Sequence, residues 1–147
     1  MGSRYADGTK VSVEASQSEA IAILKRYGAS DYMFGEADGA GFVAFKFRGF
    51  PVRVSVPKPL AKPCGGSGPR IPAGVQIEAE KRRQWRVLIL WLKGQLEAID
   101  NELISPYRGF MPFLLLKDGR TMGEAAEEEP ALLAKLGSGL ALPAPKG

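Results

Sequence analysis

The sequence of 147 residues is long enough for one domain with a substantial core, and its 45% hydrophobic and 9% aromatic content is typical of a globular protein. The chain contains no histidine, which excludes Ser-His-Asp and Cys-His nucleophiles and histidine-ligated metal sites. With Cys64 as its one cysteine it forms no internal disulfide, and it has neither a bilayer-spanning apolar run nor a secretory signal after Met1. We therefore expect a cytoplasmic protein without membrane contact, metal or cofactor, with a single domain over residues 1–136 and a flexible tail over residues 137–147.

The net charge of +4 hides an uneven distribution. Residues 43–93 carry a net charge of +9, whereas residues 1–42 carry −2 and residues 94–147 carry −3. A basic middle favours contact with a polyanion, although a solvated surface on a protein of high pI explains the same pattern equally well. The candidate nucleic-acid-binding residues are Lys46, Arg48, Arg53, Lys58, Lys62, Arg70, Lys81, Arg82, Arg83 and Arg86.

The first expected elements are a strand and a helix near the N-terminus. Polar and apolar residues alternate over residues 9–14, which predicts a half-buried strand. Ser16 and Glu19 then match a capping box, so a helix is expected to begin there and to run to about Tyr27. Gly28 can adopt the left-handed conformation that ends a helix.

Three strands are predicted next, over residues 31–36, 42–47 and 50–56. The last two form a hairpin around the turn Arg48-Gly49, in which the glycine is free to take a positive φ. A two-residue turn places three cross-strand pairs on one face, which we assign to the core: Phe47 with Phe50, Phe45 with Val52, and Val43 with Val54.

The other face of this hairpin carries Phe42 beside Lys46 and Arg53. An exposed ring next to cations is an arrangement that binds single-stranded nucleic acid, because bases stack on the ring and phosphates meet the cations. The alternative, which we favour, is that Phe42 packs under another segment while the two cations are solvated.

Residues 57–74 are predicted to form a loop with five prolines and four glycines, which is longer than most connections inside a domain. Such a loop is either functional or a flexible linker. A long helix is expected over residues 78–103, because apolar residues recur there at three- and four-residue steps. Residues 87–92 are apolar on every side of that helix, which predicts a place in the middle of the domain.

The C-terminal part is expected to contain a buried strand over residues 113–117, the turn Asp118-Gly119 and a short helix over residues 130–136. The acidic run over residues 124–129 suits a solvated helix entry or, alternatively, an acidic lid over the basic surface. The predicted fold class is α+β, with an N-terminal β-α-β-β-β unit packed on the long central helix and a short C-terminal β element and helix.

Four stretches of the chain are distinctive: residues 9–13, 16–28 and 47–57, and the segment from Gln84-Trp85-Arg86 to Lys117-Asp118-Gly119-Arg120-Thr121. Together they resemble a group of small uncharacterised proteins of bacterial phages and prophages, over about residues 9–124. The resemblance carries no activity and no site residues. It implies the cytoplasm of a bacterial host cell, and it favours a role in phage DNA metabolism or in counteracting host defence.

We expect a non-enzymatic protein that binds the phosphate backbone of nucleic acid with little sequence preference, and single-stranded DNA in preference to duplex DNA or RNA. The alternative is a phage protein-interaction module that inhibits or redirects a host defence or replication complex. A homodimer through the long helix fits either hypothesis. An enzyme is a third hypothesis, because Glu97 and Asp100 share a helix face and could hold magnesium, but solvated pairs of this kind are far commoner.

Overall fold

The computed structural model describes residues 11–61, 71–131 and 134 of the chain. In chain order its elements are α1 (Val13–Arg26), β1 (Ser30–Ala37), β2 (Ala40–Phe47), β3 (Phe50–Ser55), α2 (Ala73–Asp100), α3 (Pro106–Phe110), the 3-10 helix η1 (Met111–Phe113) and α4 (Met122–Glu128).

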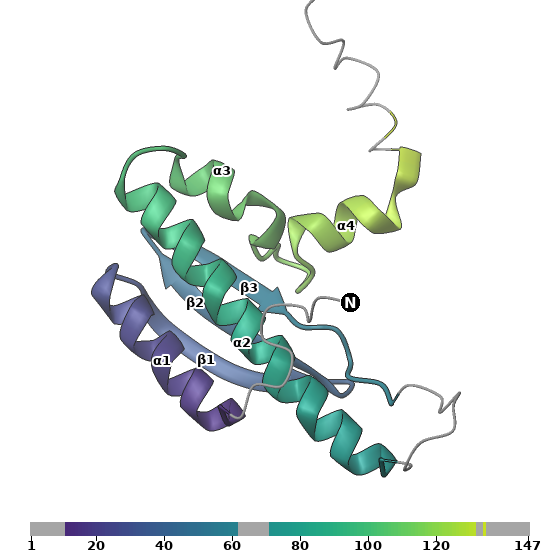
Figure 1. The fold of residues 1–147 in the computed structure, drawn as a ribbon. Coiled ribbons are helices and arrows are strands. Elements are labelled where there is room, and N and C mark those ends of the chain that lie inside the picture. The colour runs from purple at the N-terminus through teal and green to yellow at the C-terminus, as the bar shows by residue number, and fades with distance from the viewer. Residues whose placement is uncertain (1–10, 62–70, 132–133, 135–147) are drawn as a thin grey trace, which may run out of the picture.

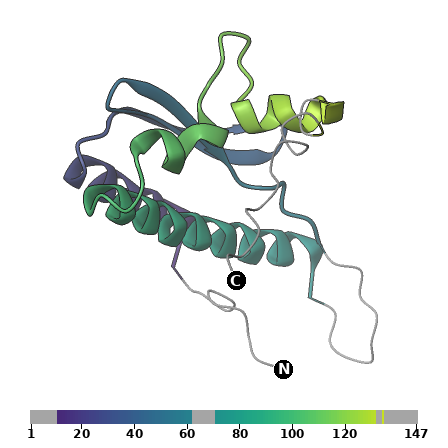
Figure 2. The ribbon, with the colours of Figure 1, turned by 90° about the horizontal axis from the view of Figure 1, so that it is seen from above.

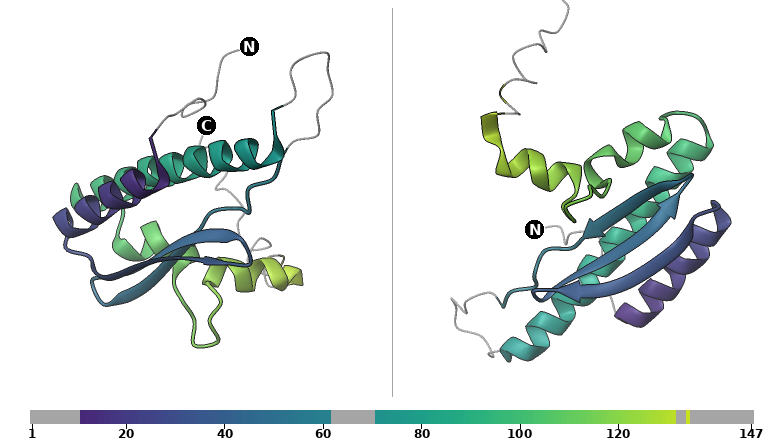
Figure 3. Two further views of the ribbon diagram at one scale, coloured as in Figure 1. Left: turned by 90° about the horizontal axis from the view of Figure 1, so that it is seen from below. Right: turned by 180° about the vertical axis from the view of Figure 1, so that it is seen from behind.

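The strands form one antiparallel sheet in the order β1-β2-β3 (Figure 1). Helices α1 and α2 cover one face of the sheet, and α4 lies on the opposite side at the β3 edge (Figures 2 and 3). The α+β class is therefore confirmed. Within the described ranges, no helix combines the length and the apolar character needed to cross a membrane.

The N-terminal segment differs from the prediction, because Val13 and Glu14 belong to α1 and not to a strand. The start of the predicted strand, at residues 9 and 10, lies outside the described residues. Ser12 caps α1 by accepting a hydrogen bond from the backbone N–H of Ala15 at 3.1 Å, whereas Ser16 lies one turn inside the helix and is fully buried. The described unit is thus α-β-β-β.

The β2–β3 hairpin has the predicted register. Its turn residues Arg48 and Gly49 have φ values of 49° and 86°, the left-handed pair that matches the twist of a two-residue hairpin. The three predicted pairs are confirmed on the core face: Phe47 with Phe50, Phe45 with Val52, and Val43 with Val54.

Strand β1 pairs with β2 through an irregular start. The register shifts between Ser30 and Met33, and Asp31 within this bulge has a φ of 51°. The Asp31 carboxylate forms an ion pair of 3.3 Å with Lys46 of the neighbouring strand. The other edge of β1 has no partner strand in the part of the chain that the structure describes.

Helix α2 begins and ends earlier than the predicted range of residues 78–103. Its C-terminus is a Schellman motif, because Glu102 has a φ of 60° and the N–H groups of Glu102 and Leu103 donate to the carbonyls of Ile99 and Ala98. Leu103 consequently leaves the helix and is 79% exposed. The buried face of α2 consists of Gln84, Trp85, Leu88, Ile89, Leu92, Leu96 and Ile99.

The prediction that residues 87–92 are buried on every side is wrong, because Val87 is 41% exposed and Leu90 and Trp91 are only half-buried. The sheet covers one side of α2, and α1 lies beside it in the same layer (Figure 2), so part of the helix surface stays uncovered.

The C-terminal part contains more helix and less strand than predicted. Residues 113–117 do not form a strand, since only the isolated bridges of Leu114 to Val52 and of Leu115 to Thr121 are present. The turn at Asp118-Gly119 is confirmed by a φ of 90° at Gly119. The acidic run forms α4 itself instead of preceding a helix. Of the helix predicted over residues 130–136, the structure describes only positions 130, 131 and 134, which are helical.

Candidate nucleic-acid interface

The ten predicted basic residues do not form one surface. Lys62 and Arg70 lie outside the described residues. Arg48 occupies the β2–β3 turn, whereas Lys58 follows β3 at the opposite end of the hairpin. Six extended residues of β3 separate these two ends by about 20 Å.

Four of the cations lie at the exit of β3 or in the first half of α2, although successive helix residues point about 100° apart, so Lys81, Arg82 and Arg83 do not all face one way. We call Lys58, Lys81, Arg82 and Arg83 the basic end. Lys58 and Arg83 line one hollow of about 450 Å³. The side chain of Lys81 reaches Glu36 of β1 at 3.6 Å, which ties this part of α2 to the sheet. The chain reversal at Gly39 also contributes, because a Cβ there would lie 3.1 Å from the Lys58 side chain.

Several of these cations already have carboxylate partners. Arg83 donates its Nε–H to Glu80 at 2.9 Å within α2. Arg86 pairs with Glu19 and so links α2 to α1. Lys58 and Arg82, by contrast, make no ion pair within the described ranges.

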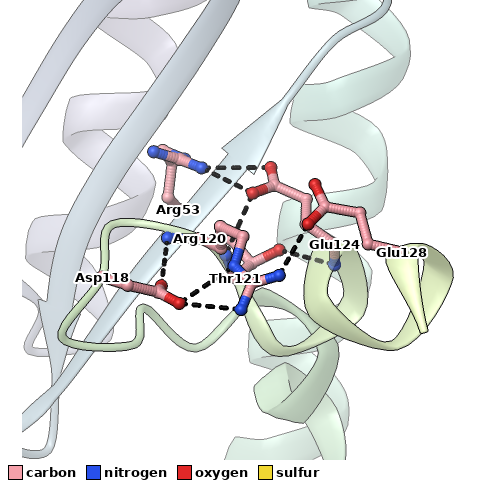
Figure 4. Close-up of polar contacts among 6 residues, drawn as sticks. All are labelled: Arg53, Asp118, Arg120, Thr121, Glu124 and Glu128. Carbon is pink, nitrogen blue, oxygen red and sulfur yellow. Dashed lines mark hydrogen bonds and ion pairs between the residues drawn. The ribbon is translucent and has the colours of Figure 1, made fainter. Parts of the chain in front are cut away.

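Arg53 is held on the outer side of the sheet by α4. Its Nη2 donates to both carboxylate oxygens of Glu124, at 3.0 and 2.9 Å (Figure 4). Glu124 also completes a capping box with Thr121, whose side chain accepts from the Glu124 N–H while its own N–H donates to the Glu124 carboxylate. Arg53 must therefore leave Glu124 before it can contact a phosphate.

A second carboxylate cluster fixes the turn before α4 (Figure 4). The backbone N–H of Arg120 donates to Asp118 at 2.9 Å, and this bond, together with the Arg120 side chain, lowers the pKa of Asp118. The Arg120 guanidinium also pairs with Glu128 at 2.6 Å. The acidic run is thus engaged with two arginines, and it neither faces nor covers Lys58 through any contact in the described part of the chain.

Replacing Glu124 with alanine should lower the free energy of unfolding by about 1–2 kcal/mol, because the substitution removes half of the capping box and leaves Arg53 without its partner. Urea denaturation followed by circular dichroism measures this. Glu127→Ala is the matched control, since Glu127 lies on the same helix, is exposed and has no ion pair with a described residue. Equal losses in the two variants would contradict the role given to Glu124.

Among the described residues, no exposed aromatic platform lies on the outer face of the sheet. Phe42 is half-buried, and its ring lies over Gly35 of the neighbouring strand, where a Cβ would come within 2.6 Å of the ring. The ring thus packs across the sheet, on a glycine that leaves room for it. Lys46, on the same face, pairs with Asp31.

Glu97, one of the two carboxylates considered for magnesium, has another partner, and so have two carboxylates of β1. Glu97 accepts a hydrogen bond from the Tyr27 hydroxyl, which raises the pKa of Tyr27. Asp31 and Glu36 pair with lysines. Within residues 11–61, 71–131 and 134, no three Cys, Asp or Glu side chains are grouped so that they could hold a metal ion.

One feature of the interface was missed from the sequence, namely a groove between the end of β3 and α2. It encloses about 360 Å³ and is lined mainly by apolar side chains, including Val54, Val56, Val87, Trp91 and Phe113. Gln84 also lines it; this side chain is 9% exposed, and its buried Oε1 has no hydrogen-bond partner. A signal existed in the sequence, because Val87 and Trp91 are four residues apart and lie off the stripe that fills the core.

Neither a protein-family model nor a curated protein nor a solved structure matches this chain. A function must therefore be argued from the residues themselves. The similarity to phage and prophage proteins stays a prediction.

Proposed function

We propose that this chain is a non-enzymatic nucleic-acid-binding protein of phage or bacterial origin, which acts in the bacterial cytoplasm and contacts the phosphate backbone with little sequence preference. The observation that supports this most directly is the basic end: Lys58 from the exit of β3 and Arg83 from α2 line the same hollow, and Lys81 and Arg82 are adjacent on the helix. Cations from two elements can follow a phosphate backbone, because they flank it from both sides.

The ion pairs in this region are compatible with such binding. The Lys81 pairs with Glu36 and Glu78 are partly exposed and contribute only about 0–1 kcal/mol each, so a phosphate can compete for Lys81. Lys58 and Arg82 have no partner to give up in the described ranges. Counterion release from the phosphates then supplies most of the affinity.

We favour single-stranded DNA over duplex DNA or RNA. The hollow of about 450 Å³ beside Lys58 adjoins the apolar groove, since both are lined by Pro57, Arg83 and Gln84. An apolar surface next to cations suits a strand whose bases are not paired, because only such bases expose their faces and their Watson–Crick edges.

The test is fluorescence-anisotropy titration of the full chain against labelled single-stranded DNA, duplex DNA and RNA of equal length over a series of salt concentrations. Four phosphate contacts predict a slope of log K against log salt of about −3 for a single strand. Polyglutamate as competitor controls for attraction to any polyanion. Absence of binding to all three nucleic acids at low salt would refute the proposal.

A second candidate function is a protein-interaction module that inhibits or redirects a host defence or replication complex. It is favoured by apolar side chains around α3, since Leu103, Tyr107 and Met111 are exposed and four residues apart. Exposed apolar residues of this kind are typical of surfaces that bind proteins, and they are equally available to a second copy of the chain.

A further inference from the structure

The groove and the hollow at the basic end share a wall. The apolar groove of about 360 Å³ and the charged hollow of about 450 Å³ share Pro57, Arg83 and Gln84 in their walls. On one side of Gln84 the walls are Val87, Trp91 and other apolar side chains, and on the other side the hollow is lined by Lys58 and by Glu80, the ion-pair partner of Arg83. We call the apolar part the Gln84 groove.

The buried side-chain oxygen of Gln84 has no hydrogen-bond donor among the described residues. The side chain is 9% exposed, and its Oε1 is fully buried without accepting a hydrogen bond. Buried acceptors are almost always satisfied in native proteins, because an unpaired one has lost its water without replacement. Gln84 lines the groove, so a rotation of its terminal amide would turn this oxygen toward a molecule there that presents an N–H group.

We infer that the Gln84 groove binds one unpaired base of a nucleic-acid strand whose phosphates lie on the basic end; this inference rests on the proposed function. The base would lie against the apolar walls formed by Val87 and Trp91 and donate an N–H to Gln84 Oε1. The flanking phosphate would meet Lys58, which lines the adjoining hollow. Small-ligand sites have volumes of about 300–1,000 Å³, so the groove is large enough for one base.

This arrangement is tolerant of sequence and selective for single strands. Adenine, cytosine and guanine each carry an amino group, and thymine and uracil carry an imino N–H, so every base has a donor for Gln84. In a duplex these donors are paired and the faces are stacked, so the groove has nothing to bind there.

The experiment compares three labelled ligands of equal length: single-stranded DNA, a strand with the same phosphates in which the bases are replaced by abasic sites, and duplex DNA. The wild-type chain should bind the base-containing strand about tenfold more tightly than the abasic strand, as expected for one stacked base. Two variants should remove the difference between the two strands, which is measured within each variant. They are Gln84→Met, which keeps the side-chain size without the acceptor, and Val87→Glu, which places a charge in the exposed rim of the groove.

Ala22→Glu is the control for Val87→Glu, because Ala22 is exposed on α1, remote in sequence from every residue of the groove. Binding of neither strand would refute the proposed function. Equal affinity for the base-containing and abasic strands would refute the groove while leaving the proposed function intact. A base-dependent difference that survives in both Gln84→Met and Val87→Glu would also refute the groove.

Discussion

Replacing Phe110 with alanine should lower the free energy of unfolding by about 3–5 kcal/mol, a large share of the roughly 5–15 kcal/mol that stabilises a domain. Phe110 is 1% exposed. Its ring meets three others edge-on, with centroid distances of 5.7 Å to Phe45, 5.7 Å to Phe47 and 6.2 Å to Trp91. Phe110 therefore joins α3 to both the sheet and α2. Its removal leaves a cavity, which a neighbouring ring could fill only by giving up its own packing contacts.

Thermal and urea unfolding measure this effect, with a fall in midpoint temperature of roughly 10–20 °C expected. Met111→Ala is the matched control, because Met111 is the next residue and its side chain is exposed, so its truncation should cost less than about 1 kcal/mol. If Phe110→Ala and Met111→Ala unfold alike, Phe110 does not have the role given to it here.

Reversing two charges at the basic end, with Lys58→Glu and Arg82→Glu together, should weaken DNA binding strongly. Counterion release at two phosphates favours binding more at about 0.1 M salt than at about 1 M. The loss of both contacts should therefore lower the affinity at about 0.1 M salt by about 25-fold for a single strand and about 60-fold for a duplex. Repulsion by the two new carboxylates adds to this loss. The slope of log K against log salt should become shallower by about 1.4 for a single strand and about 1.8 for a duplex.

Lys93→Glu with Lys117→Glu is the matched control, since these two lysines are exposed and lie outside the basic end. The control produces the same change in net charge, so a comparable loss of binding in both double variants would mean that net charge, and not the basic end, attracts DNA. Because Lys58 and Arg82 form no ion pair with another described residue, their replacement should leave the unfolding midpoint nearly unchanged.

The hairpin was predictable because two independent local signals agreed. Arg48-Gly49 specifies a two-residue turn, and the alternation of large apolar residues on either side specifies which face is buried. At the N-terminus the local signals conflicted. Ser12 and Ser16 are each followed by a residue that suits a first turn, and only the packing of Ala20, Ile23 and Leu24 against the rest of the core selects Ser12.

The structure of the C-terminal part could not be predicted, because it depends on long-range contacts that sequence patterns do not reveal. Phe110 lies in a segment that resembles a turn, and its burial follows from the position of Phe45 and Phe47 on the sheet. The candidate site shows the same limit. The charge distribution along the sequence identified ten candidate cations. It could not show that Arg53 pairs with Glu124, because the two residues are 71 positions apart in the chain. The Gln84 groove likewise exists only where the exit of β3 meets α2.

The bulge at the start of β1 has a consequence for the behaviour of concentrated solutions. An open sheet edge is a template on which another molecule can add a strand, and extended stacking of this kind leads to aggregation. In this chain the left-handed Asp31 interrupts the regular spacing of donors and acceptors, and its carboxylate and Lys46 place charge beside the same edge. A second copy of the chain that approaches β1 therefore meets an irregular and charged strand edge. This disfavours the addition of a further strand at the β1 edge, which no other strand of the described chain covers.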